Sequence, residues 1–314
     1  MNRWFQKGNA RRFYRIDMPV KTFVTPASPI RDREIYASGL DYFPPTLRRY
    51  IENEKNETLY WVNKVQDQKV VVTKMFKEVI DYIEFFGDAT QMMAKGLNPA
   101  KDPQYLFRLQ SDIEGFSAIE ELLPSSPKTY RYFKMLEEKF LAYLKSMFNS
   151  ARHSKPDYFE ANRHLPLGYK IDETLEMLTS KSNFDKIPLI QAIVHLVQFV
   201  NAHLNAYRQL NDDNILRHYP DEWPRMKVNI SASGIAIRYK KRFTQFEKVD
   251  VFLYFPDQDK VLEFEGTVVD TRSIDSHHEE RVAINFDFPN GQKQDFLQNQ
   301  IQRYEIEECM DFQL

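Results

Sequence analysis

The chain has 314 residues and a formal net charge of −2, from 43 Lys+Arg and 45 Asp+Glu residues. This balance excludes a general attraction to nucleic acid polymers or acidic membranes, so any anion-binding site must be a local feature. The single cysteine, Cys309, excludes an intrachain disulfide framework and a cysteine-based zinc site, which is typical of a reducing cytoplasm. With 24 Phe, 17 Tyr and only 9 Gly, we expect a chain that is folded throughout, in two compact bodies.

Signals for export, membrane insertion, catalysis and metal binding are not found in the sequence. The first residues lack the apolar core of a signal peptide, and no stretch approaches the roughly 18 uncharged residues of a membrane span. None of the motifs G-x-x-x-x-G-K-S/T, G-x-S-x-G and H-E-x-x-H occurs, and His195 and His203 are too far apart along a helix to pair on a metal. We therefore expect a cytoplasmic protein with no transmembrane segment, no metal, no cofactor and no enzymatic activity.

The N-terminal part of the chain begins as a strand and then turns helical. A basic lead-in is followed by β-branched and aromatic residues that predict a strand over residues 16–24. Prolines at positions 26, 29, 44 and 45 mark a loop, and beyond it the pattern is helical for roughly 160 residues. The clearest helix carries a heptad pattern with one lysine in its seam, formed by Val62, Val65, Lys69, Val72, Phe76, Val79, Ile83 and Phe86.

A heptad stripe of this length needs a partner helix, and the sequence leaves two partners open. A second copy of the chain can cover the stripe, which would make a homo-oligomer through the helical segment with Lys69 fixing the register. Alternatively, helices of the same chain cover it in an intramolecular bundle. Two further stripes could supply that cover, one of Tyr132, Leu136, Phe140, Tyr143 and Met147, the other of Ile190, Ile193, Val197, Val200 and Leu204.

After Pro220 and Pro224 the period switches to two, which predicts a series of short strands. These cover residues 226–230, 234–239, 249–255, 262–270 and 282–288, and a closing helix follows around residues 296–304. The series lacks a first strand, which residues 16–24 can supply. The expected fold class is therefore α+β, a small antiparallel β-barrel interrupted by a large α-helical insertion. Residues 1–30 would hold the first barrel strand, 31–222 the insertion, and 223–314 the remainder of the barrel and the C-terminal helix.

Two short motifs resemble the signature of the PilZ domain family. An R-x-x-x-R element from Arg11 to Arg15 precedes the first strand, and a D/N-x-S-x-x-G element from Asn229 to Gly234 lies between two strands. The first element alone occurs readily by chance, so the weight comes from the order and placement of both. The resemblance covers about a third of the chain. Because more than two hundred residues separate the motifs, it is to an atypical subgroup with a long helical insertion that mediates oligomerisation.

The resemblance implies a cyclic di-GMP receptor rather than an enzyme. Arginine suits this ligand because a guanidinium can fork onto a phosphate or onto guanine O6 and N7. Alternate residues of an extended segment share a face, so Asn229 and Ser231 would present short polar groups together. Gly234 permits the turn, through a positive φ or through close approach of the ligand to the backbone. The implied ligand-binding residues are Arg11, Arg15, Asn229, Ser231 and Gly234, with Arg12 as an accessory contact.

Such a receptor would relay the level of the second messenger to a protein partner of unknown identity in the bacterial cytoplasm, in a process such as biofilm formation or motility. The alternative is a constitutive oligomeric scaffold whose PilZ-like barrel does not bind nucleotide. A third reading, RNA binding by the basic lead-in and the barrel, is disfavoured because the overall charge is balanced.

Overall fold

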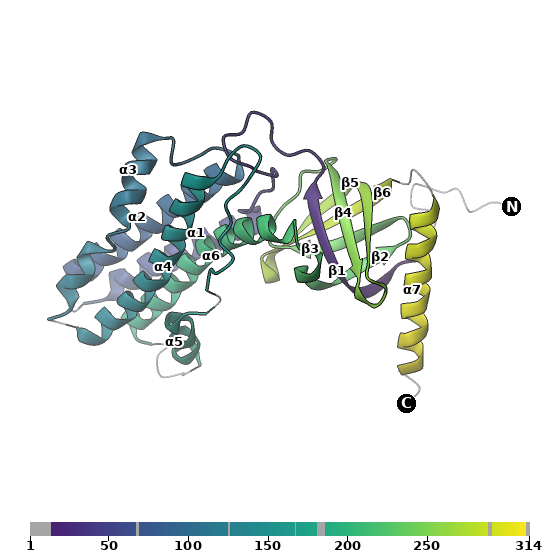
Figure 1. The fold of residues 1–314 in the computed structure, drawn as a ribbon. Helices are drawn as coiled ribbons and strands as arrows, with labels where there is room; N and C mark the ends of the chain where they lie inside the picture. The colour runs from purple at the N-terminus through teal and green to yellow at the C-terminus, as the bar shows by residue number, and fades with distance from the viewer. Residues whose placement is uncertain are drawn as a thin grey trace. The chain divides into compact units, whose positions relative to one another are not determined.

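The computed structural model describes residues 14–66, 69–124, 126–166, 168–180, 186–287 and 291–311. The chain divides into two compact units (Figure 1). One unit combines the N-terminal segment through Pro29 with Leu216–Leu314, and the other is Ile30–Ile215. Two of the expected ligand-binding residues, Arg11 and Arg12, lie outside the described part of the chain.

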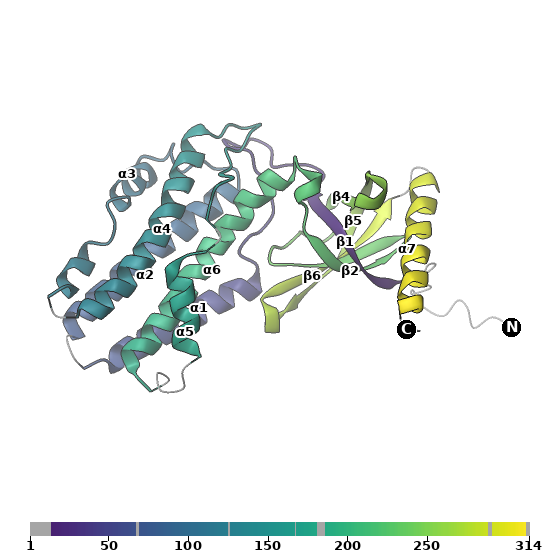
Figure 2. The same ribbon diagram turned by 60° about the horizontal axis from the view of Figure 1, so that its bottom comes forward.

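The first unit is built on a closed antiparallel barrel, with strand order β1-β2-β3-β6-β5-β4 (Figures 1 and 2). Its strands are β1 (Ile16–Pro26), β2 (Arg225–Ser231), β3 (Gly234–Tyr239), β4 (Lys248–Phe255), β5 (Lys260–Ile274) and β6 (Glu279–Asp287). Each lies close to the position that the period-two pattern predicts. The α+β fold class is confirmed, with a barrel and a large helical region in one chain.

Strand β1 closes the barrel although it lies far from the other strands in sequence. Its first half pairs with β2, from Ile16 opposite Ile230 to Lys21 opposite Arg225. Its second half pairs with β4, ending with Pro26 opposite Val249. The proline is tolerated there because it is the last residue of the strand. The helical region therefore interrupts the barrel, as the missing first strand predicted.

Alternation along the strands separates an apolar barrel interior from a polar exterior. Val20 and Val24 of β1 and Val228 and Ile230 of β2 are each exposed by 3% or less. Asn229 lies between Val228 and Ile230 in β2, so its polar side chain is on the outer face. The C-terminal helix α7 (Gly291–Asp311) packs on the barrel through its buried Leu297 and Ile301.

The second unit is helical. Its helices are α1 (Pro45–Lys64), α2 (Lys69–Ala94), α3 (Pro103–Asp112), α4 (Pro127–His153), α5 (Lys170–Thr179) and α6 (Pro188–Leu216), with a short 3-10 helix, η1 (Ser117–Leu122), before α4. Helix α3 shows how the sequence sets such an element: Asp102 caps it by accepting from the backbone N–H of Gln104 and Tyr105, and Pro103 occupies its first position. Within the described residues, no helix combines the length and the apolar character needed to cross a membrane.

The prediction of one continuous heptad helix is wrong. Val62 belongs to α1, Val65 is extended beyond the end of that helix with ψ 126, and α2 begins at Lys69. The apolar spacing runs through this break because both helices contribute to one core. Lys69 is exposed, so it is not a polar residue in a buried seam.

The stripe on α2 is covered within the single chain, as the intramolecular alternative expects. Its five apolar residues are exposed by 3% or less: Val72, Phe76, Val79, Ile83 and Phe86. Helices α4 and α6 supply the cover through edge-on aromatic contacts. Phe76 meets Phe133 with ring centroids 5.2 Å apart, and Phe86 meets Tyr207 at 5.5 Å. Such pairs add about 1 kcal/mol each beyond the area they bury.

The two histidines of α6 serve helix packing. His195 lies 2.7 Å from a carboxylate oxygen of Glu54 on α1. His203 is buried against Gly87 and its Nδ1 lies 3.0 Å from the carbonyl oxygen of Phe199. Burial lowers the pKa of His203 to about 4, because the surroundings offer no solvation for the charged ring.

We expect this burial to make stability depend on pH. The unfolded chain binds a proton at His203 below pH 6.5, whereas the folded chain does so only near pH 4, so stability should fall by about 3 kcal/mol as pH drops through that window. His203→Gln removes the titrating group. Urea unfolding of both proteins at pH 7, 6, 5 and 4 should show a steeper loss in the wild type. Burial raises the pKa of Asp112 to about 6. Its protonation therefore changes stability in the opposite direction, but by the same amount in both proteins. Parallel profiles would contradict the assignment.

Candidate ligand-binding site

The fold brings Arg15 and Asn229 together from positions 214 residues apart in the chain. Asn229 of β2 lies opposite Asp17 of β1, and Arg15 immediately precedes that strand. Asn229 Nδ2 donates to Asp17 Oδ1 at 2.8 Å, and Arg15 donates a longer hydrogen bond of 3.5 Å to Asn229 Oδ1. One amide therefore links a base and an acid on the outer face of the barrel.

Ser231 is placed two residues after Asn229 on the same strand, but its hydroxyl is turned to the backbone. The side chain is only 1% exposed. Its Oγ accepts from the backbone N–H of Ser233 at 3.4 Å and donates to the carbonyl of Gly234 at 3.4 Å. In this structure Ser231 holds the tight β2–β3 connection in shape, and its contact with a ligand stays a prediction.

Gly234 is required by the barrel backbone. It is not among the residues with positive φ, so that expectation is wrong. A Cβ at this position would lie 2.4 Å from the carbonyl oxygen of Ile284 and 3.3 Å from Cα of Asn285 on β6. The β6 backbone makes this close approach, because β3 and β6 pair at Gly234 and Asn285, and the approach of a ligand to Gly234 stays a prediction.

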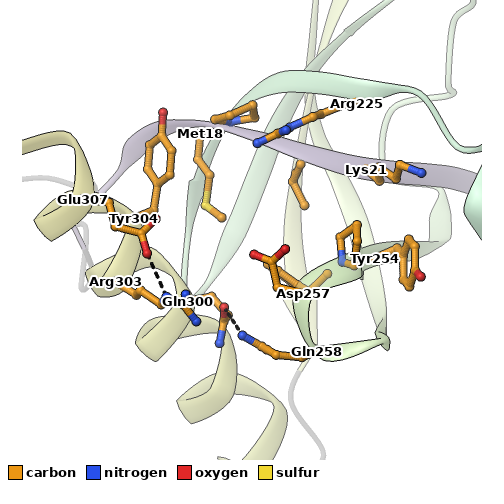
Figure 3. A pocket seen from close by; sticks show the side chains of 14 residues that line it. Met18, Lys21, Arg225, Tyr254, Asp257, Gln258, Gln300, Arg303, Tyr304 and Glu307 are labelled. Atoms are coloured by element: carbon orange, nitrogen blue, oxygen red, sulfur yellow. Dashed lines mark hydrogen bonds and ion pairs between the residues drawn. The ribbon is translucent and has the colours of Figure 1, made fainter. Parts of the chain in front are cut away.

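A pocket of about 260 Å³ opens between β1 and α7, at the other end of the β1–β2 pair (Figure 3). Met18 and Arg225 lie on one side of it, and the helix presents Arg303 and Glu307 on the other. Arg303 donates to Glu307 at 2.8 Å, and this hydrogen bond raises the pKa of Arg303 above its usual range. The Lys21 ammonium donates to the carbonyl of Asp221 at 2.6 Å.

Two of the cations that line the pocket, Lys21 and Arg303, are therefore already engaged with partners in the protein. The sequence pattern predicts α7 only as a closing helix and does not indicate this pocket. The signal available was the charged i, i+4 pair of Arg303 and Glu307 beside the buried Ile301. Among the described residues there is no group of three or more His, Cys, Asp or Glu side chains that could hold a metal ion.

The model of the PilZ domain family matches residues 207–305. The chain contains a PilZ domain. The matched segment includes β2 to β6 and most of α7 but not β1, so the strand pairing is what joins Arg15 to the PilZ domain. PilZ domains form a family of cyclic di-GMP receptors, in agreement with the resemblance of the two motifs.

A solved structure of a pathogenic protein from Xanthomonas campestris is similar to part of the chain. It is described as a new tetrameric PilZ domain self-assembled via an unusual helical bundle. The two sequences are 19% identical, the match covers 44% of this chain and 78% of that one, and the TM-score is 0.26. No curated protein matched the chain.

We expect Gly234→Ala to destabilise the PilZ domain by about 2 kcal/mol or more, because the new methyl group must displace the β6 backbone. Gly291→Ala is the matched control, since a Cβ at Gly291 meets nothing within 4 Å. The free energy of unfolding from urea titrations measures both. Equal stabilities of the two variants would show that β6 does not approach Gly234 as closely as the structure has it.

Proposed function

We propose that the chain is a non-catalytic receptor for cyclic di-GMP, which relays the level of this messenger to a protein partner. The observation that carries the proposal is the Arg15–Asn229–Asp17 cluster on the outer face of a PilZ domain. The cluster unites one residue from each family motif, although the motifs lie in distant parts of the sequence. A chance R-x-x-x-R would not be expected to end beside the second motif.

The chemistry of the cluster suits this ligand. A cyclic dinucleotide offers guanine edges and two phosphodiester groups, and the guanidinium of Arg15 can fork onto either. Its hydrogen bond to Asn229, at 3.5 Å, places the guanidinium beside the amide of the second motif. Asn229 can both donate and accept, which suits a base edge that presents acceptors beside donors.

The remaining expected residues have distinct roles in the proposal. Arg11 and Arg12 lie before the described residues, and we propose that they close over the ligand from the lead-in to β1. Ser231 and Gly234 hold the β2–β3 connection and the adjacent β6 backbone, which keeps Asn229 in place. Binding becomes a signal if the ligand binds one arrangement of the chain more tightly than another. The helical unit would then present the favoured arrangement to the partner.

The constitutive scaffold is the second candidate function. The burial of the α2 stripe within one chain weakens the case for self-association through that stripe. Homo-oligomer formation through another surface of the helical unit remains part of the proposal. We place the protein in the bacterial cytoplasm, where this messenger acts, with biofilm formation or motility as the processes it would regulate.

Calorimetric titration with cyclic di-GMP tests the proposal. We expect saturable binding by the wild type, and Arg15→Ala and Asn229→Ala should each weaken it at least about tenfold, because a charge-assisted hydrogen bond is worth roughly 1.5–3 kcal/mol. Arg131→Ala, on the exposed face of α4, removes the same charge outside the PilZ domain and should leave the affinity unchanged.

Two controls make the outcome unambiguous. GTP tests whether any guanine nucleotide suffices, and a thermal shift gives an independent readout, because ligand at 100 times its dissociation constant stabilises the folded state by about 2.7 kcal/mol. Absence of heat and of thermal shift in the folded wild type would sink the receptor proposal and favour the scaffold.

A further inference from the structure

Three arginines stand side by side across neighbouring strands of the PilZ domain. Arg238 of β3 lies directly opposite Arg281 of β6, and Arg281 lies directly opposite Arg272 of β5. Arg238 and Arg281 occupy the outer face, because Ile237, before Arg238, and Val282, after Arg281, are each exposed by 1% or less. Arg272 shares this face as the strand partner of Arg281.

Among the described residues, one of the three arginines has a carboxylate partner. Arg272 forms an ion pair of 2.7 Å with Asp270. Within the described residues, the side chains of Arg238 and Arg281 form neither an ion pair nor a hydrogen bond. The acid nearest in sequence, Glu280, points to the opposite face of β6, where it is fully buried and accepts from Ser273 at 3.0 Å.

Keeping such a row costs stability. Like charges directly opposite each other on adjacent strands are destabilising, and here two such pairs share Arg281. No hydrogen bond or ion pair of Arg238 or Arg281 offsets this cost in the described chain. An anion seated between the guanidinium groups would offset it, because each group can direct two parallel N–H donors at a phosphate.

The row lies beside the Arg15–Asn229 cluster. Asn229 pairs with Ala236, and Arg238 is two residues further along β3 on the same face. From strand geometry, the Cα atoms of Asn229 and Arg238 are roughly 8 Å apart. On this face Ala236 follows Asn229 across the strands and pairs in turn with Ala283, and the two alanines are exposed by 4% and 8%. One ligand that extends across these strands could reach both groups.

We propose that Arg238 and Arg281 form a second anion-binding position, which takes a phosphate of the cyclic dinucleotide held by Arg15 and Asn229. Arg272 contributes less because Asp270 already neutralises it. This inference rests on the proposed function and deepens it, since it names where the second phosphodiester binds. The two positions together select a ligand with two separated anionic groups and discriminate against a mononucleotide.

The test compares the double variant Arg238→Gln/Arg281→Gln with the wild type by calorimetric titration with cyclic di-GMP. We expect the affinity to fall at least about tenfold, since two charge-assisted contacts are lost. The control is Arg131→Gln, an exposed arginine on α4 outside the PilZ domain, which should change the affinity less than threefold. Affinity for GMP, which has one phosphate, should change less than affinity for cyclic di-GMP.

A stability measurement separates binding from folding. Because the double variant removes like-charge repulsion, its thermal midpoint without ligand should equal or exceed that of the wild type. A lower midpoint would show that the arginines hold the barrel together and would overturn the inference, as would an affinity for cyclic di-GMP equal to that of the control.

A second probe, inorganic pyrophosphate, distinguishes this inference from the proposed function. If the wild type binds pyrophosphate through Arg238 and Arg281 but does not bind cyclic di-GMP, the anion position stands and the receptor proposal fails. If wild-type binding of either probe persists unchanged in the double variant, the anion position fails. If the folded wild type binds neither probe, both fail.

Discussion

The pairing of β1 with both β2 and β4 is the constraint on which the rest of the structure depends. Strand β1 supplies one wall of a closed barrel whose other strands begin about two hundred residues later in the chain. Without it, β2 and β4 would each present an unpaired edge, which is a liability for a β protein. The same pairing places Arg15 beside Asn229, so barrel closure and assembly of the candidate site are one event.

A large insertion between β1 and β2 is compatible with this closure because it folds on its own core. Phe76, Phe86 and Phe140 are fully buried in the helical unit and meet rings from neighbouring helices. The entropic cost of joining two strands through a long connection grows only slowly with its length, and an ordered insertion adds little to it. Both units can therefore be stable in one chain.

Much of the fold could be predicted from the sequence, because local patterns specify it. Strands β2 to β6 follow a period of two between turn residues, and β1 was recognised because the barrel otherwise lacked a strand. The break between α1 and α2 was missed, because an apolar spacing of three and four continues across Val65 when two helices share a core. The positive φ considered for Gly234 is not found, because the residue begins β3 and pairs with β6.

The candidate site was only partly predictable, because its contacts join residues on different strands. The motifs identified Arg15 and Asn229, but the hydrogen bond from Asn229 to Asp17 depends on the register of β1 against β2. The arginine row depends on two further registers, which a single sequence does not reveal. Contacts between strands follow from pairing, and pairing is set by the closed barrel as a whole.

The most direct measurement of the central claim is a double-mutant cycle on cyclic di-GMP binding with Arg15→Ala, Asn229→Ala and the combined variant. If β1 and β2 build one site, the two residues contact the same ligand, and the double variant should lose less binding free energy than the sum of the single losses, by about 0.5 kcal/mol or more. Losses that add to within about 0.3 kcal/mol would contradict the account, because they would mean that Arg15 and Asn229 act independently.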